Sequence, residues 1–163
     1  MNKFVSKSIE DTAKIAIDWL RKIVVERVEV RPPRSDLRCA YVVGLSGHLG
    51  AGKTAFVKCV AKELGIEEEV TSPTFVIMKI YDIDTATAQK KFGSDFRWTR
   101  LVHIDAYRLE KQEVLSALNF ESVVSDPHNL VLVEWPENVG IARQYPHISF
   151  GIDAEGERVI EIN

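Results

Sequence analysis

The stretch that decides the fold is Gly47-His48-Leu49-Gly50-Ala51-Gly52-Lys53-Thr54. It fits the pattern G-x-x-x-x-G-K-[ST], the phosphate-binding loop of nucleotide triphosphatases. An apolar run at 40–45 precedes the loop and predicts a buried strand, and a helix-favouring stretch follows it from Lys53 to Leu64. Strand, glycine-rich turn and helix therefore stand in the order that such a loop requires.

Each part of this loop has a chemical task. The glycines let successive backbone N–H groups curl around phosphates, and the helix N-terminus adds the positive end of its dipole. We expect Lys53 to reach the β- and γ-phosphates and the Thr54 hydroxyl to ligate magnesium. A glycine-rich strand-to-helix turn without a ligand is the alternative, which the complete motif in its context disfavours.

Composition sets the broad class. With 163 residues, 45% of them hydrophobic, we expect a single domain over residues 1–163. No membrane span or signal peptide is evident, so we expect a cytoplasmic protein with no membrane association. The net charge of −3 argues against a surface that itself holds nucleic acid. Cys39 and Cys59 lack metal-ligand spacing and are expected to be small core residues.

Periodicity places the other elements. Apolar positions from Ile9 to Val24, behind an N-cap at Ser8, predict an amphipathic helix, and the Pro-containing stretch 27–38 predicts an exposed connection. The polar stretch from Asp84 to Arg100 reads as a long loop. The remaining elements are strands at 75–81, 101–105 and 130–134, a short helix at 110–118, and a hairpin of strands at 148–152 and 158–162.

Helices that alternate with apolar strands around a phosphate loop indicate an α/β fold, a three-layer sandwich with a mixed, mostly parallel sheet. Ligands of such sheets sit at the carboxyl ends of the strands. Two predicted strands end in an acid there, Asp105 and Glu134. Each carboxylate could bind Mg²⁺ directly, hold it through water, or orient the attacking water. Capping of the next helix is the structural alternative for either acid alone.

Four blocks in order carry a family resemblance: GHLGAGKT at 47–54, VTSPTF at 70–75, HIDAYRL at 103–109 and VEWP at 133–136. Together they resemble the motifs of the TsaE family, bacterial ATPases required for making threonylcarbamoyladenosine next to the anticodon of certain tRNAs. The similarity runs from about Ser8 to the final hairpin. Four motifs in one order are far more specific than the phosphate loop alone.

The resemblance implies a site and partners. It implies ATP with Mg²⁺, phosphates on the loop residues 47–54, Thr54 on the metal, and Asp105 and Glu134 as the acids that govern metal and hydrolysis. The family's protein acts on a complex of the threonylcarbamoyl-transferase subunit and its dimerisation companion, so tRNA is met only through that complex. Turnover is slow and is thought to reset the complex between cycles. Ser72 lies in a segment placed like a switch loop, or in an ordinary turn before a strand.

One departure affects the loop itself. The family usually carries Asp where this chain has His48. A neutral imidazole can hydrogen-bond, but it cannot supply the negative charge of a carboxylate. The stretch from Asp84 to Arg100 and the connection before the first predicted strand are longer than in the family, which we expect to alter docking surfaces more than chemistry.

Three further side chains are candidates for the site or its surroundings, and two of them have alternative interpretations. His103 shares a strand face with Asp105, so it either approaches the nucleotide or the partner-facing cleft, or is a core histidine with satisfied hydrogen bonds. Trp135 packs either beside the nucleotide or in the core. Trp98, in the polar stretch, is expected to be an exposed anchor for a partner.

Two other functions remain open. A small-molecule kinase could use the same loop, with Arg97, Arg100 and Arg108 as a clamp for an acceptor phosphate. A nucleotide-binding scaffold that does not hydrolyse is conceivable because of His48. Guanine specificity is disfavoured, since no N-K-x-D-like segment follows the loop.

Overall fold

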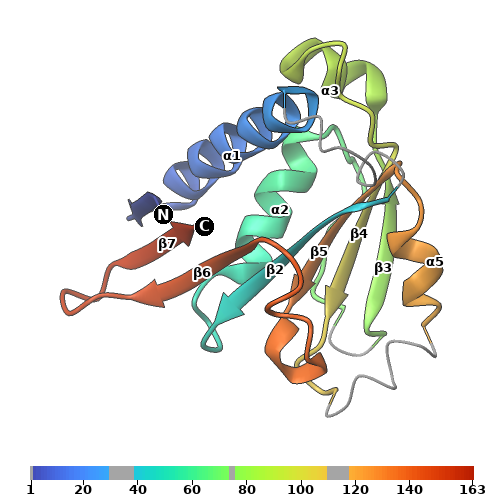
Figure 1. The fold of residues 1–163 in the computed structure, drawn as a ribbon. Coiled ribbons are helices and arrows are strands. Elements are labelled where there is room, and N and C mark those ends of the chain that lie inside the picture. Colours follow the sequence, from blue (N-terminus) through green and yellow to red (C-terminus); the bar gives the residue numbers. More distant parts are fainter. Residues whose placement is uncertain (1, 30–38, 74–75, 110–117) are drawn as a thin grey trace.

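The computed structural model describes residues 2–29, 39–73, 76–109 and 118–163. A single sheet runs through these residues in the strand order β1-β7-β6-β2-β5-β4-β3 (Figure 1). The strands are β1 (Asn2–Ser6), β2 (Tyr41–Gly47), β3 (Met78–Asp82), β4 (Arg100–Asp105), β5 (Asn129–Glu134), β6 (His147–Ile152) and β7 (Arg158–Ile162). The helices are α1 (Ile9–Glu29), α2 (Lys53–Glu63), α3 (Thr85–Phe92), α5 (Phe120–Val124) and the short 3₁₀ helix η2 (Pro136–Val139).

The centre of the sheet is parallel. β2 pairs in parallel with β5 on one side and β6 on the other, and β5 pairs in parallel with β4. β3 and β7 run antiparallel to their neighbours, and β1 is antiparallel to β7, so β1 again points the same way as β6. The predicted mixed, mostly parallel sheet is confirmed.

The sheet is covered on both faces, which confirms the three layers (Figure 1). Strand β5 shows how its sequence serves both. Leu130 and Leu132 pack in the cluster that includes the buried residues of α1 and α2, whereas Val131 and Val133 pack in the cluster that includes Phe120 of α5. A strand buried on both faces needs an unbroken apolar run, and 130–133 supplies one. That 1–163 forms a single domain stays a prediction.

Several predicted elements need correction. The stretch from Asp84 to Arg100 is not all loop, because the Asp84 side chain accepts hydrogen bonds from the N–H groups of Ala86 and Thr87 and so caps α3. The strand predicted at 75–81 begins only at Met78, since the described residues before it form a turn after Pro73. Helix α1 continues to Glu29, and the rest of the predicted connection, 30–38, lies outside the described residues, as do 110–117 of the predicted helix.

Two side chains lie opposite to expectation. Trp98 is 2% exposed and packs against Tyr41 and Phe96, so it is part of the core rather than an exposed anchor. The aromatic packing outweighs the polar character of its sequence neighbours. Cys59 is buried as expected, but Cys39 is exposed.

The two ends of the described chain meet at one side of the sheet. Asn2 pairs with Ile162 where β1 lies against β7 (Figure 1). The sequence pattern did not indicate the strand β1. Since β1 points the same way as β6, its last residue, Ser6, lies at the carboxyl edge of the sheet. The start of β7 lies there too, because β7 is antiparallel to β6.

Candidate functional site

The loop 47–54 lies at the carboxyl edge, between the central strand β2 and the N-terminus of α2. Gly47 has φ 144°, and a Cβ at this position would lie 2.2 Å from the backbone oxygen of Phe150 on β6. Gly52, the N-cap residue of α2, has φ 110°. Both positions therefore require glycine. The loop's tip is open, since His48, Leu49 and Gly50 are exposed, whereas Ala51 is buried.

Lys53 is held inside this loop. Its side chain is only 4% exposed, and its Nζ donates to the backbone oxygens of Gly47 at 2.6 Å and His48 at 3.0 Å. Burial lowers the pKa of the ammonium, and the nearby carboxylates, led by Glu134, act in the opposite direction. The loop carbonyls thus keep a cation at the place where a phosphate-binding loop needs positive charge.

The two strand-end acids are neighbours. Asp105 pairs with Glu134 in the register of β4 and β5, and the two residues are 4% and 3% exposed. Thr54 Oγ1 donates to Glu134 Oε1 at 2.8 Å, which ties the start of α2 to the end of β5. Ser72 Oγ donates to Asp105 Oδ2 at 2.8 Å, so the segment predicted as a switch loop contacts the second acid.

His103 serves Glu134, a link that sequence reasoning missed. It is completely buried on β4, and its Nε2 lies 2.8 Å from Glu134 Oε1. An ionised carboxylate only accepts, so opposite the charged form of Glu134 the Nε2 atom acts as the donor. Within the described residues Nδ1 is buried without a hydrogen-bond partner. His103 is thus not a core histidine with all its hydrogen bonds satisfied: it contacts a strand-end carboxylate, and its approach to a nucleotide stays a prediction. The only signal in the sequence is its position on the Asp105 face of the strand.

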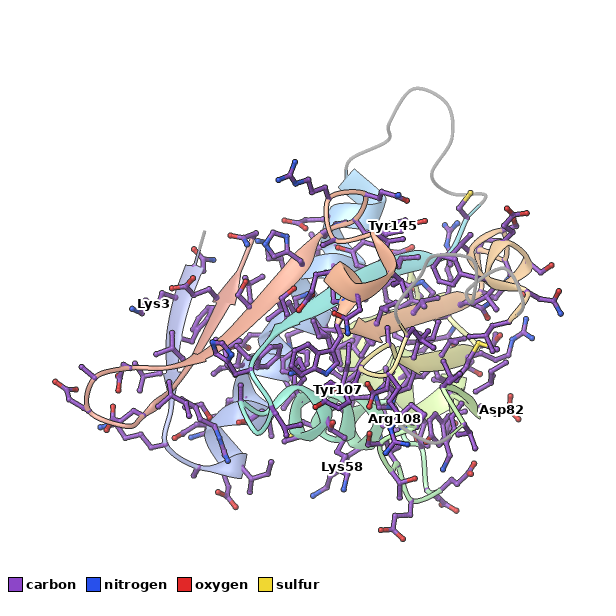
Figure 2. All side chains as sticks on the ribbon, turned by 90° about the horizontal axis from the view of Figure 1, so that it is seen from below. Lys3, Lys58, Asp82, Tyr107, Arg108 and Tyr145 are labelled. Atoms are coloured by element: carbon purple, nitrogen blue, oxygen red, sulfur yellow. The ribbon has the colours of Figure 1, made fainter. Side chains whose placement is uncertain are left out.

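Trp135 is half-buried and contacts residues at both ends of the loop, Leu45 before it and Lys53 within it. It adopts a left-handed backbone conformation, with φ 58° and ψ 48°, and its N–H donates to the Leu45 oxygen at 3.1 Å. Its ring centre lies 3.9 Å from Lys53 Nζ and 5.1 Å from the Tyr107 ring. Left-handed backbone is costly for a bulky residue and often marks a functional position. Figure 2 views this edge of the sheet from below and labels Tyr107 and Arg108, both exposed.

The donors gathered here fit a magnesium ion. Thr54, Glu134 and Asp105 offer hydroxyl and carboxylate oxygens, the hard ligands that Mg²⁺ prefers. The Thr54 hydroxyl donates its proton to Glu134, which leaves its oxygen lone pairs for a cation. Asp105 Oδ1 accepts the Tyr107 N–H at 3.0 Å, so this carboxylate is fixed by the backbone as well as by Ser72.

The arginines considered as a phosphate clamp do not gather at this site. Arg100 begins β4, whereas Asp105 ends it, so Arg100 lies at the opposite edge of the sheet, where it forms an ion pair with Asp126. Arg97 precedes that strand start and is exposed. Of these three arginines, Arg108 alone lies at the carboxyl edge, because it follows Asp105.

A phosphate loop lies between the central parallel strand β2 and a helix, and acids end the next two strands on one side, β5 and β4. This arrangement defines an α/β protein with the fold of the P-loop nucleoside triphosphatases. Residues 6–160 match the family model described as threonylcarbamoyl adenosine biosynthesis protein TsaE. The chain belongs to the TsaE family.

Individual relatives agree. The chain is 35% identical over 162 residues to the tRNA threonylcarbamoyladenosine biosynthesis protein TsaE of Treponema pallidum, with 97% of each chain covered. It is 34% identical to the protein of the same name from Nostoc sp. strain PCC 7120, over 77% of this chain and 72% of that one. Among solved structures, YdiB of Bacillus subtilis superposes with a TM-score of 0.63 at 26% identity, covering 98% of this chain and 82% of that chain. None of the described helices is long and apolar enough to cross a membrane.

Proposed function

We propose that this chain binds and hydrolyses Mg·ATP and that it supports threonylcarbamoyladenosine modification of tRNA by acting on the threonylcarbamoyl-transferase complex. The family and the names of the relatives support the pathway. The observation that carries the ATPase part is the hydrogen bond between Thr54 and Glu134, because it joins the phosphate loop to a buried strand-end acid. Cytoplasm, where tRNA is modified, is the expected compartment.

Binding follows from the loop. The N–H groups at the start of α2 and the Lys53 ammonium supply positive charge for the phosphates. On binding, Lys53 exchanges the carbonyl oxygens of Gly47 and His48 for phosphate oxygens. It stays beneath the Trp135 ring, which limits its freedom. Mg²⁺, when bound, supplies the charge that polarises the phosphoryl oxygens.

Hydrolysis needs an oriented water. Glu134 uses Oε1 to accept hydrogen bonds from Thr54 and His103, and within the described residues Oε2 accepts none. We assign Oε2 to orienting the attacking water, in the way that strand-end acids of such enzymes act. We assign Asp105 to the metal, together with Thr54 and Glu134. Ser72, bonded to Asp105, connects that side to the segment 70–73.

The proposed partners are the threonylcarbamoyl-transferase subunit and its dimerisation companion, with tRNA bound by them rather than by this chain. The net charge of −3 supports this division, because direct tRNA binding by phosphate neutralisation calls for a basic surface. Exposed apolar side chains border the site, with Leu49 76% exposed and Tyr107 45% exposed, and they offer contact area to a protein partner.

The test is single-turnover hydrolysis of Mg·ATP by the chain alone and with the purified transferase complex. We expect slow hydrolysis alone and a faster rate with the complex. Tight ATP binding without hydrolysis under either condition would instead identify a nucleotide-dependent scaffold. Phosphate transfer to an added acceptor would identify a kinase, for which Arg97 and Arg100 no longer provide a clamp.

A further inference from the structure

The strand order determines the direction in which a bound nucleotide extends across the sheet edge, provided that the proposed function holds. The acids Asp105 and Glu134 lie on β4 and β5, on one side of the loop strand β2. The other side of β2 is occupied by β6, then β7, then β1. The γ-phosphate must lie near the acids, because these act on the metal and the attacking water. The α-phosphate and the nucleoside therefore extend toward β6 and β7.

Arg158 lies on that second side, against the loop. It is the first residue of β7 and so lies at the carboxyl edge. A Cβ placed on Gly52 would lie 3.6 Å from Arg158 Cδ and 3.8 Å from Nε. Along β7 it is in phase with Ile160 and Ile162, which pack in the cluster of α1 and α2, so its side chain leaves the sheet on the face that carries α2.

The charge of Arg158 is not used by the fold. In the described residues the exposed guanidinium takes part in no ion pair. The preceding Glu157 is engaged by Lys7 Nζ at 2.7 Å. Opposite Arg158 on β1 stands Ser6, whose hydroxyl lies 2.7 Å from that of Thr12 in a buried, neutral pair. A cation beside the N-terminus of α2 without its own carboxylate is suited to a phosphate.

We propose that Arg158 binds the α-phosphate of the nucleotide, and so completes the loop from the side opposite to Asp105 and Glu134. The guanidinium can form two parallel hydrogen bonds with a phosphate group. ADP and ATP share the α-phosphate, so Arg158 strengthens the binding of both equally. It takes no part in the chemical step, which occurs at the other end of the nucleotide.

The test is calorimetric titration of Arg158→Ala with Mg·ATP and Mg·ADP, followed by single-turnover hydrolysis at saturating ATP. Loss of one charge-assisted contact predicts a Kd about tenfold higher for both nucleotides. The hydrolysis rate at saturation should be that of the parent. Arg158→Lys, which keeps the charge, should recover part of the affinity, whereas Arg158→Gln should not.

Arg97→Ala is the matched control, because it removes the same charge from an exposed side chain at the opposite edge of the sheet. It should bind both nucleotides as the parent does. Unchanged ADP and ATP affinity in Arg158→Ala would overturn the inference, as would a loss confined to ATP, which would place Arg158 at the γ-phosphate. If the parent chain itself binds no ATP, the proposed function fails, and that result is distinct from a parent that binds and an Arg158 variant that binds equally well.

Discussion

Charged side chains are buried at one end of the strands β4 and β5 and partly exposed at the other. At the carboxyl ends, Asp105 and Glu134 are almost completely buried, and Lys53 is buried beside them. Where β4 begins, Arg100 pairs with Asp126, and the two side chains remain 40% and 30% exposed. Burying a charge costs several kcal/mol unless it is well paired. The exposed pair avoids most of that cost, so the buried group at the carboxyl edge is better explained by function than by stability.

The largest effect is expected for Lys53→Ala. The ammonium is the one side-chain cation that lies inside the loop among the described residues, so its loss should raise the Kd for Mg·ATP roughly a hundredfold or more. The free energy of unfolding should change little, because the desolvation cost of burying this charge offsets much of what its contacts contribute. Calorimetric titration and thermal unfolding measure the two quantities. If Lys53→Ala binds Mg·ATP as tightly as the parent, the loop is not the nucleotide site. Lys53→Met, which keeps contact with Trp135, controls for packing.

Glu134→Gln and Asp105→Asn should separate binding from turnover. Backbone N–H groups and Lys53 hold the phosphates, whereas the acids act on metal and water. Both variants should therefore keep most nucleotide affinity and hydrolyse roughly a hundredfold more slowly. Rates are measured by single turnover with the transferase complex present. If both variants match the parent there, neither acid has the assigned role.

His103 should matter through Glu134 alone. His103→Leu removes the donor to Oε1 and should slow hydrolysis by about tenfold. The ATP Kd should stay near the parental value, because among the described residues the hydrogen bond of the imidazole goes to Glu134 and not to the loop. His103→Gln, which can still donate an N–H, should recover part of the rate. A merely structural role predicts no such recovery. His128→Gln, an exposed histidine that pairs with Asp126, serves as the control and should leave the rate unchanged.

The sequence predicted the elements that depend on local pattern. The loop, the strands that end at Asp105 and Glu134, and the terminal hairpin all follow from short-range signals. Contacts that depend on which strands are neighbours did not. The bond from His103 to Glu134 requires β4 beside β5 in one particular register, and the approach of Arg158 to Gly52 requires β7 to return beside the loop. The prediction that Trp98 is exposed was wrong because it used only the polar sequence neighbours, whereas the contact with Tyr41 on β2 depends on the fold.

The departure at position 48 predicts a gain. His48 is exposed at the loop's tip and supplies no carboxylate to the metal side of the site. His48→Asp should raise single-turnover hydrolysis on the order of tenfold, with a smaller change in ATP binding, because a group that organises metal or water acts mainly on the chemical step. Equal or lower rates, with or without the transferase complex, would mean that the imidazole is neutral or adaptive in this chain.

The smallest effect is expected at the other edge. Arg100→Ala breaks the pair with Asp126, and exposed ion pairs contribute about 1 kcal/mol or less. The strand should persist, because Leu101, Val102 and Ile104 are completely buried and anchor it. Urea unfolding should therefore show a loss within about 1 kcal/mol that shrinks at high salt, since solvent screens an exposed pair. ATP binding and hydrolysis should equal those of the parent. A hydrolysis defect with normal stability would show that charge at this edge also serves the site, and would remove the contrast between the two ends of the strands.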